Sequence, residues 1–243
     1  MSRKIAVIFF LFVSLFISNV MLFAGSDMQS SDLEDEFSYS EEIVADPLEP
    51  YNRVITSFND SLYFILLDPT AKGYAAVVPR GSRLGIRNFF HNIMFPIRFV
   101  NNILQLKFAK AGIETARFII NSTMGIAGFL DPAKSCFCME SYDEDFGQTL
   151  GFYKMGSIFH IDWPFIGPSN LRDSIGYVGD FFLNPINYIF PNMWIVTGIH
   201  VFEKINHVSL HLGEYEKLKK ESVDYYLQIR DSYEQFREKE IKE

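Results

Sequence analysis

Apolar positions recur at helical spacing through much of this chain. Over residues 50–67 they return every three or four positions, which predicts an amphipathic helix that ends at Asp68-Pro69. Two more helices are predicted over residues 81–103, with a break at Phe95-Pro96, and over residues 107–124. Strict alternation of apolar and polar residues over strand lengths is nearly absent. The pattern therefore predicts an all-α fold.

The second half of the chain is less regular. Residues 146–182 are dense in Gly and Pro, which predicts a long loop region, and its aromatic residues argue against disorder. Residues 181–201 are apolar but interrupted by Pro and Asn, so we expect either a segment in a membrane interface or a buried hairpin. Residues 213–240 predict a charged amphipathic helix that packs on its own domain, with docking onto a partner as the alternative.

The N-terminal region has the pattern of an export signal. Arg3 and Lys4 precede an apolar run from residue 5 to 24, and small residues favour cleavage after Ser26. The run is also long enough to cross a bilayer, so an uncleaved anchor is the alternative. We therefore expect a signal peptide or anchor over residues 1–26, an acidic disordered linker over 27–45 and one helical domain over 46–243.

Charge and composition narrow the function. The formal net charge is −8, and loss of Arg3 and Lys4 with the signal would bring it near −10, which argues against a nucleic-acid partner. The chain contains 25 Phe, and 48% of its residues are hydrophobic. This composition fits either a Phe-rich core or apolar surface that is offered to lipid.

No motif for phosphate binding, dinucleotide binding, nucleophilic catalysis or HExxH zinc binding is present. His200, His207 and His211 could share a helix face, but a partly wet surface is favoured over a metal site. Cys136 and Cys138 could close only a small strained disulfide ring in an oxidising compartment. We expect no enzyme activity, no cofactor and no metal site.

Two groups of residues that lie close together in the sequence have simple structural interpretations. The acidic group Glu140, Asp143, Glu144 and Asp145 is expected to form a solvated surface. Glycines three residues apart, at 125 and 128 and at 176 and 179, indicate either close backbone approach or helix ends and turns, with the second favoured.

Several ordered blocks together resemble one known family. They are Asp46-Pro47-Leu48-Glu49-Pro50-Tyr51-Asn52-Arg53, Asp68-Pro69, residues 85–89, residues 117–131, residues 146–151 and Leu171-Arg172-Asp173. Across residues 46–233 the chain resembles the MlaA/VacJ family of outer-membrane lipid-transport proteins. Members carry a lipoprotein cysteine just after the apolar run, whereas this chain has cysteines only at 136 and 138. The resemblance therefore leaves the membrane anchor unexplained.

The resemblance implies a ring of amphipathic helices in the outer membrane with a central channel for phospholipid. It also implies a trimeric porin and a periplasmic lipid-carrier protein as partners. We expect two groups of residues to shape the channel: Phe58, Asn59 and Leu62 on the first helix, and Met124, Gly125, Gly128 and Phe129 in a later turn. The function implied is removal of mislocalised phospholipid from the outer leaflet; the alternative is an envelope scaffold without lipid transport.

Overall fold

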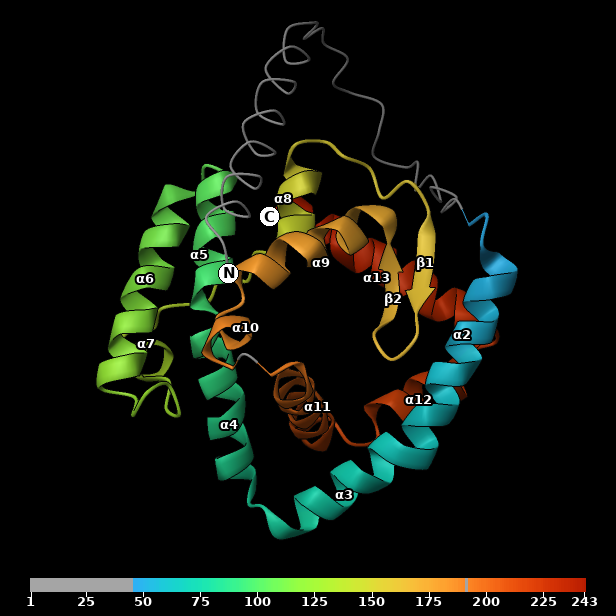
Figure 1. The fold of residues 1–243 in the computed structure, drawn as a ribbon, viewed down its shortest axis with the longest axis horizontal. Coiled ribbons are helices and arrows are strands. Elements are labelled where there is room, and N and C mark those ends of the chain that lie inside the picture. Colours follow the sequence, from blue (N-terminus) through green and yellow to red (C-terminus); the bar gives the residue numbers. More distant parts are fainter. Residues whose placement is uncertain (1–45, 191) are drawn as a thin grey trace, which may run out of the picture. The chain divides into compact units, whose positions relative to one another are not determined.

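A computed structural model describes residues 46–190 and 192–243, all of which belong to a unit that spans residues 44–243. The expected signal, its cleavage site and the acidic linker lie outside the described residues. Figure 1 shows the helices of this unit arranged around a central space, with α2 and α3 on one side and α4–α6 on the other.

The described elements, in chain order, are α2 (Glu49–Leu62), the π-helical turn η1 (Tyr63–Leu67), α3 (Asp68–Val77), α4 (Arg80–Ile93), α5 (Phe95–Leu104), α6 (Phe108–Thr123), α7 (Pro132–Ser135), α8 (Phe146–Phe152), β1 (His160–Trp163), β2 (Gly167–Asn170), α9 (Leu171–Leu183), α10 (Ile186–Ile189), α11 (Met193–Leu210), α12 (Glu214–Glu221) and α13 (Tyr225–Lys242). The prediction of a mostly helical fold is confirmed, as are the break at Phe95-Pro96 and the helix over residues 107–124. The prediction of a long loop over residues 146–182 is wrong at both ends, which form α8 and α9.

The sequence does not predict the antiparallel hairpin of β1 and β2, in which His160 faces Asn170 and Trp163 faces Gly167. Both strands are four residues long, and β2 begins with Gly167-Pro168, which is unusual in a strand. The buried positions of the hairpin are polar: His160, Asp162, Ser169 and Asn170. A search for alternating apolar residues therefore misses it.

The helix that begins at Glu49 does not end at Asp68-Pro69, contrary to the prediction. Pro69 has no N–H and would clash with the preceding turn of a regular α-helix. The π-helical turn η1 widens the backbone just before it, and the Asp68 N–H donates to the Tyr63 carbonyl, five residues back. The chain thus continues from α2 through η1 into α3 (Figure 1).

The predicted helix over residues 213–240 is two helices, α12 and α13. Ser222 is extended, and the Asp224 carboxylate accepts the N–H groups of Tyr226 and Leu227 to cap α13. The expectation that the apolar residues of this segment share one buried face is also wrong, because Tyr226 is buried whereas Phe236 is largely exposed.

Polar side chains fill much of the interior. In α5 the buried residues are Arg98, Asn101 and Asn102, and in α6 they include Glu114, Arg117 and Asn121. These two helices are joined by the ion pair of Arg98 Nε with Glu114 Oε2 at 2.7 Å. Because buried charges are costly unless they are paired and hydrogen-bonded, these contacts fix the packing of the helices.

Part of the acidic group at residues 140–145 belongs to this polar interior, so the expectation of a solvated surface is wrong for Glu144 and Asp145. Glu144 is buried and lies 2.7 Å from Lys107 Nζ, and Asp145 accepts hydrogen bonds from Arg237. Asp143 pairs with His91 at 2.8 Å. Asp143, whose side chain is 63% exposed, and Glu140, which pairs with the exposed Lys134, match the expectation.

The two glycine pairs have different roles. Gly125 and Gly128 lie in a turn, as favoured from the sequence, and Gly128 has a φ of +93°. Gly176 and Gly179 instead lie inside α9, so the interpretation as helix ends is wrong for them. A Cβ on Gly176 would lie 2.5 Å from the Gly147 backbone N, which means that α8 and α9 touch through their backbones.

Large apolar side chains are exposed over much of the surface. On α2 and η1, Val54 and Ile65 are exposed while Asn52 and Thr56 are buried. A second group runs from α9 to the start of α11 and includes Val178, Phe181, Tyr188, Ile189, Met193 and Trp194, the last 78% exposed. Exposed apolar patches of this extent mark surfaces that meet a membrane or a partner. Across residues 46–190 and 192–243, none of the helices combines the length and apolar character needed to cross a bilayer.

Candidate functional site, a central cavity

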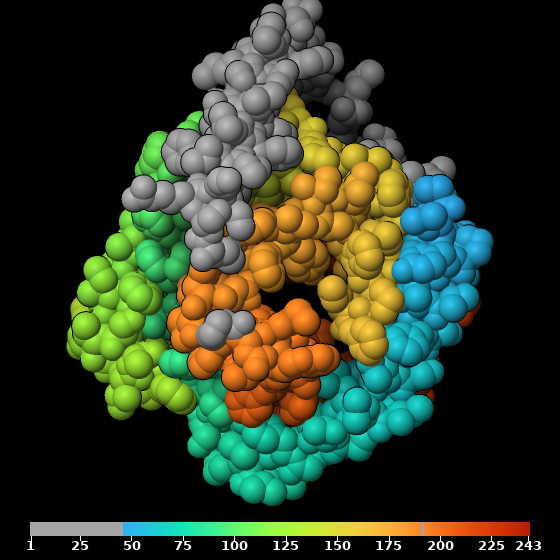
Figure 2. Space-filling view, viewed as in Figure 1, coloured from blue at the N-terminus to red at the C-terminus, as the bar shows by residue number. Residues whose placement is uncertain are grey.

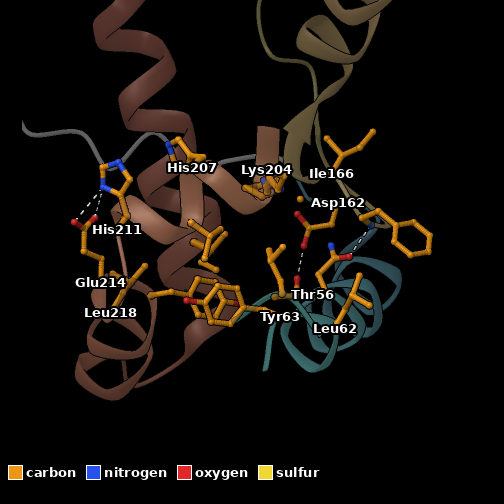
Figure 3. A pocket seen from close by; sticks show the side chains of 18 of the residues that line it. Thr56, Leu62, Tyr63, Asp162, Ile166, Lys204, His207, His211, Glu214 and Leu218 are labelled. Carbon is orange, nitrogen blue, oxygen red and sulfur yellow. Dashed lines mark hydrogen bonds and ion pairs between the residues drawn. The ribbon is translucent and has the colours of Figure 1, made fainter. Parts of the chain in front are cut away.

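The candidate site is a cavity of about 890 Å³ that lies between α2, η1, the β1–β2 hairpin, α11, α12 and α13. This volume is near the upper end of the roughly 300–1,000 Å³ that is usual for ligand pockets. Figure 2 shows the molecule hollowed between the hairpin and the α10–α11 segment. Figure 3 shows side chains from α2, β1, α11 and α12 that border the cavity.

Most of the cavity wall is apolar. The apolar and aromatic lining residues are Leu62, Tyr63, Leu67, Phe165, Ile166, Pro168, Val208, Tyr215, Leu218, Tyr225, Ile229 and Phe236. Tyr63 and Tyr215 stack with their ring centroids 4.0 Å apart, which joins η1 to α12. The polar lining residues include Thr56, Asn59, Asp162, Lys204 and Glu214. An apolar cavity with a few polar groups suits an amphipathic ligand.

The hairpin is held against α2 by polar contacts. Asn52, which is fully buried, donates to the His160 carbonyl and accepts from the Asp162 N–H. Thr56, one turn further along α2, donates to the Asp162 carboxylate (Figure 3). These bonds give Asn52, in the opening octet of the family-like sequence, a concrete structural role.

His160 sits between two carboxylates at the base of the hairpin. Its ring nitrogens lie 3.3 Å from Asp162 Oδ1 and 3.2 Å from Glu234 Oε1. Burial lowers the pKa of His160, but hydrogen bonds to Asp162 and Glu234 outweigh that effect and raise the pKa to about 8. The charged ring therefore links β1 to α13 near neutral pH.

The wall formed by α11 is basic. Lys204, His207 and His211 follow one another at intervals of three and four residues, which places them on one helix face. The rings of His207 and His211 stack at 4.7 Å, and His211 Nδ1 lies 3.1 Å from Glu214 Oε1 (Figure 3). Burial within the cavity wall lowers the pKa of Lys204, although solvent still reaches its side chain.

The predicted channel residues of the first helix lie at this cavity. Asn59 and Leu62 belong to the lining. Asn59 donates to the Trp163 carbonyl at 3.0 Å and accepts from the Phe165 N–H at 2.8 Å, so it holds the tip of the hairpin. Phe58 is not among the lining residues, but its ring contacts the ring of Phe165 edge to face at 5.3 Å.

The other predicted channel residues, Met124, Gly125, Gly128 and Phe129, do not meet the first group. They form the turn after α6, which packs against α4: a Cβ on Gly128 would lie 2.5 Å from Asn92, and the Phe129 ring lies 5.1 Å from that of Phe89. A Cβ on Gly125 would meet the Asn121 and Leu130 carbonyl oxygens at 2.5 Å. Met124 is exposed. The structure thus gives this turn a packing role and does not place it in the cavity wall.

The remaining candidate metal ligands, the histidines and cysteines, do not come together as a metal site in the part of the chain that the structure describes. Over the described residues no three His, Cys, Asp or Glu side chains come together as a possible metal site. Cys136 and Cys138 are both exposed thiols on either side of Phe137. His200 lies 3.5 Å from Glu203 and is not part of the cavity lining.

Sequence reasoning misses Lys204, Asp162 and the aromatic residues of α12 and α13 as parts of the site. Lys204 could be found from its spacing to His207 and His211. Asp162 and Tyr225 carry no local signal, because the fold brings them to the cavity from distant elements.

Comparisons with known proteins agree with this architecture. The family described as MlaA lipoprotein matches residues 44–240. The intermembrane phospholipid transport system lipoprotein MlaA of Escherichia coli strain K12 is 30% identical over 196 residues, which cover 78% of this chain and 75% of that protein. An uncharacterized protein of Rickettsia prowazekii strain Madrid E is 31% identical over 202 residues, which cover 82% of this chain and 78% of that protein.

A solved structure, reported as the structural basis for maintenance of bacterial outer membrane lipid asymmetry, superposes with a TM-score of 0.72 at 30% identity. The match covers 81% of this chain and 99% of the solved one. The resemblance drawn from the sequence blocks is thereby confirmed. The chain belongs to the MlaA lipoprotein family.

Proposed function

We propose that this protein is the outer-membrane component of an intermembrane phospholipid transport system and that phospholipid passes through its central cavity. The observation that carries the proposal is the cavity itself, whose apolar wall is interrupted by a basic helix face. Apolar and aromatic side chains favour acyl chains, because apolar surface is removed from water on both partners. The polar positions provide hydrogen-bonding partners for a headgroup that would otherwise be desolvated.

The exposed apolar surface supports the proposal that the protein is embedded in a membrane. Val178, Phe181 and Met193 present apolar side chains from α9 to α11, and Tyr188 and Trp194 have the amphipathic rings that favour the interface of a bilayer. Helix faces of this kind bind in the plane of a membrane. From the family resemblance we propose that the body lies in the inner leaflet of the outer membrane.

The direction of transport and the partners are proposed by analogy with the family. We propose removal of mislocalised phospholipid from the outer leaflet, which maintains lipid asymmetry, with a trimeric porin beside the protein and a periplasmic carrier that receives the lipid. We propose no catalytic step and no cofactor or metal for this passage.

Labelling of surface-exposed phospholipid in a deletion strain tests this function. The strain should show more labelled outer-leaflet phospholipid and greater detergent sensitivity, and the wild-type gene should restore both. A Phe58→Ala gene should restore them incompletely, because loss of the ring removes the contact that positions Phe165 at the cavity.

Val54→Ala is the matched control, since Val54 is an exposed residue of the same helix outside the cavity lining. Each variant is compared at equal protein level. Unchanged surface phospholipid in the deletion strain would refute transport and favour an envelope scaffold.

A further inference from the structure

Lys204 stands out among the residues that line the cavity. It lies one turn before His207 on α11, and its side chain borders the cavity (Figure 3) and is exposed to solvent. Within the described part of the chain, Lys204 has no hydrogen-bond or ion-pair partner. By contrast, Lys219 on α12 lies 2.6 Å from Asp60 and 4.8 Å from the centre of the Phe64 ring.

The neighbouring carboxylates are engaged elsewhere. Glu214 contacts His211, and Asp162 accepts from Thr56 and lies 3.3 Å from His160. Glu203, which precedes Lys204 by one position within α11, lies 3.5 Å from His200. The ammonium group of Lys204 therefore faces the cavity without a carboxylate in contact among the described residues.

His207 lies among cationic side chains. Burial lowers the pKa of His207, and the charges of His211, Lys204 and Arg87 lower it further, while Glu203 opposes them. An anion between Lys204 and His207 would offset this repulsion and favour the protonated imidazole.

Building on the proposed function, we infer that Lys204, assisted by His207, binds the phosphodiester group of the phospholipid inside the cavity. The apolar residues Ile166, Leu218 and Ile229 line the same space and would contact the glycerol and acyl parts. Recognition of the phosphate explains how one cavity would select phospholipids over neutral lipids of the same chain length. A charge-assisted hydrogen bond to phosphate is among the stronger polar contacts in proteins.

The test is competition for a fluorescent phospholipid bound to the purified full chain in detergent. The competitors are phosphatidylglycerol, diacylglycerol with the same acyl chains, and inorganic phosphate. Lys204→Met should weaken competition by phosphatidylglycerol about 10- to 100-fold, which is the range for loss of a charged hydrogen bond, and should leave diacylglycerol unchanged. Lys204→Arg should keep most of the preference.

Lys220→Met is the matched control, because Lys220 is an exposed lysine of α12 outside the cavity lining. Lys204→Gln, with circular dichroism on every variant, separates loss of binding from loss of folding. Equal competition by phosphatidylglycerol in the wild type and in both neutral variants would overturn the inference and leave the proposed function standing. Displacement by inorganic phosphate alone would show that the site takes the free anion, and a chain that binds no phospholipid at all would refute the proposed function too.

Discussion

Replacement of Arg237 by Met is expected to lower the free energy of unfolding by about 3–5 kcal/mol, as for other broken buried ion pairs. Arg237 donates to both oxygens of Asp145, at 2.8 and 2.9 Å, and to both oxygens of Asp173, at 2.9 and 3.1 Å. Asp145 caps α8 and Asp173 lies in the first turn of α9. One side chain of α13 thus fixes the starts of two helices.

The Met side chain would leave these carboxylates without their main partner. Burial raises the pKa of Asp173, but hydrogen bonds from Arg237 and Arg172 outweigh burial and hold the pKa below its usual value. Without Arg237 the burial cost is no longer compensated.

Denaturant unfolding in detergent, followed by circular dichroism, measures the change. Lys242→Met is the control, because Lys242 forms an exposed pair with Glu238 and its loss should cost less than about 1 kcal/mol. The loss of stability in Arg237→Lys should fall between those in Lys242→Met and Arg237→Met, since lysine keeps the charge but cannot make the bidentate contacts. Equal stability of Arg237→Met and the wild type would show that the polar interior does not hold these helices together.

The second large effect is expected for Gly176→Ala, which should destabilise the fold by about 2–3 kcal/mol, as overpacking of a tight contact does. The new Cβ would lie 2.5 Å from the Gly147 backbone N and 2.7 Å from its Cα. Backbone atoms cannot rotate aside as a side chain can, so α8 and α9 would have to separate.

Gly112→Ala is the matched control for Gly176→Ala, because Gly112 lies inside α6 and a Cβ there meets nothing within 4 Å. It should stabilise α6 by roughly 0.5–1 kcal/mol, since alanine favours the helix over glycine. Thermal unfolding of the two variants beside the wild type gives the comparison. A Gly176→Ala protein as stable as Gly112→Ala would contradict the backbone contact.

Helical periodicity predicts where most helices of this fold lie, but it does not tell which face points inward. Val54 and Ile65 contribute to the apolar period of the first helix, and both are exposed, whereas Asn52 and Thr56 are buried. The same inversion holds in α6, where Glu114, Arg117 and Asn121 share the inner face. The sequence pattern that could predict this polar interior is the recurrence of hydrogen-bonding residues at helical spacing.

The candidate site could be predicted only where one helix carries it. Asn59 and Leu62 line the cavity because they lie on one face of α2. The turn at residues 124–129 is equally prominent in the family-like sequence, yet its glycines permit close packing on α4. A strong motif therefore indicates a constrained backbone as readily as a lipid contact, and the distinction needs the tertiary structure.

The central claim is that phospholipid occupies the cavity between α2, the hairpin, α11 and α13. Photoreactive p-benzoylphenylalanine at Leu62 or Ile229 tests it in cells, because both positions lie in the cavity wall. Exposed Val223, between α12 and α13, serves as the control, and Trp194 reports lipid at the outer apolar surface. We expect phospholipid adducts at Leu62 and Ile229 and none at Val223. Adducts at Trp194 without any at Leu62 or Ile229 would contradict the account, because lipid would then meet only the outside of the protein.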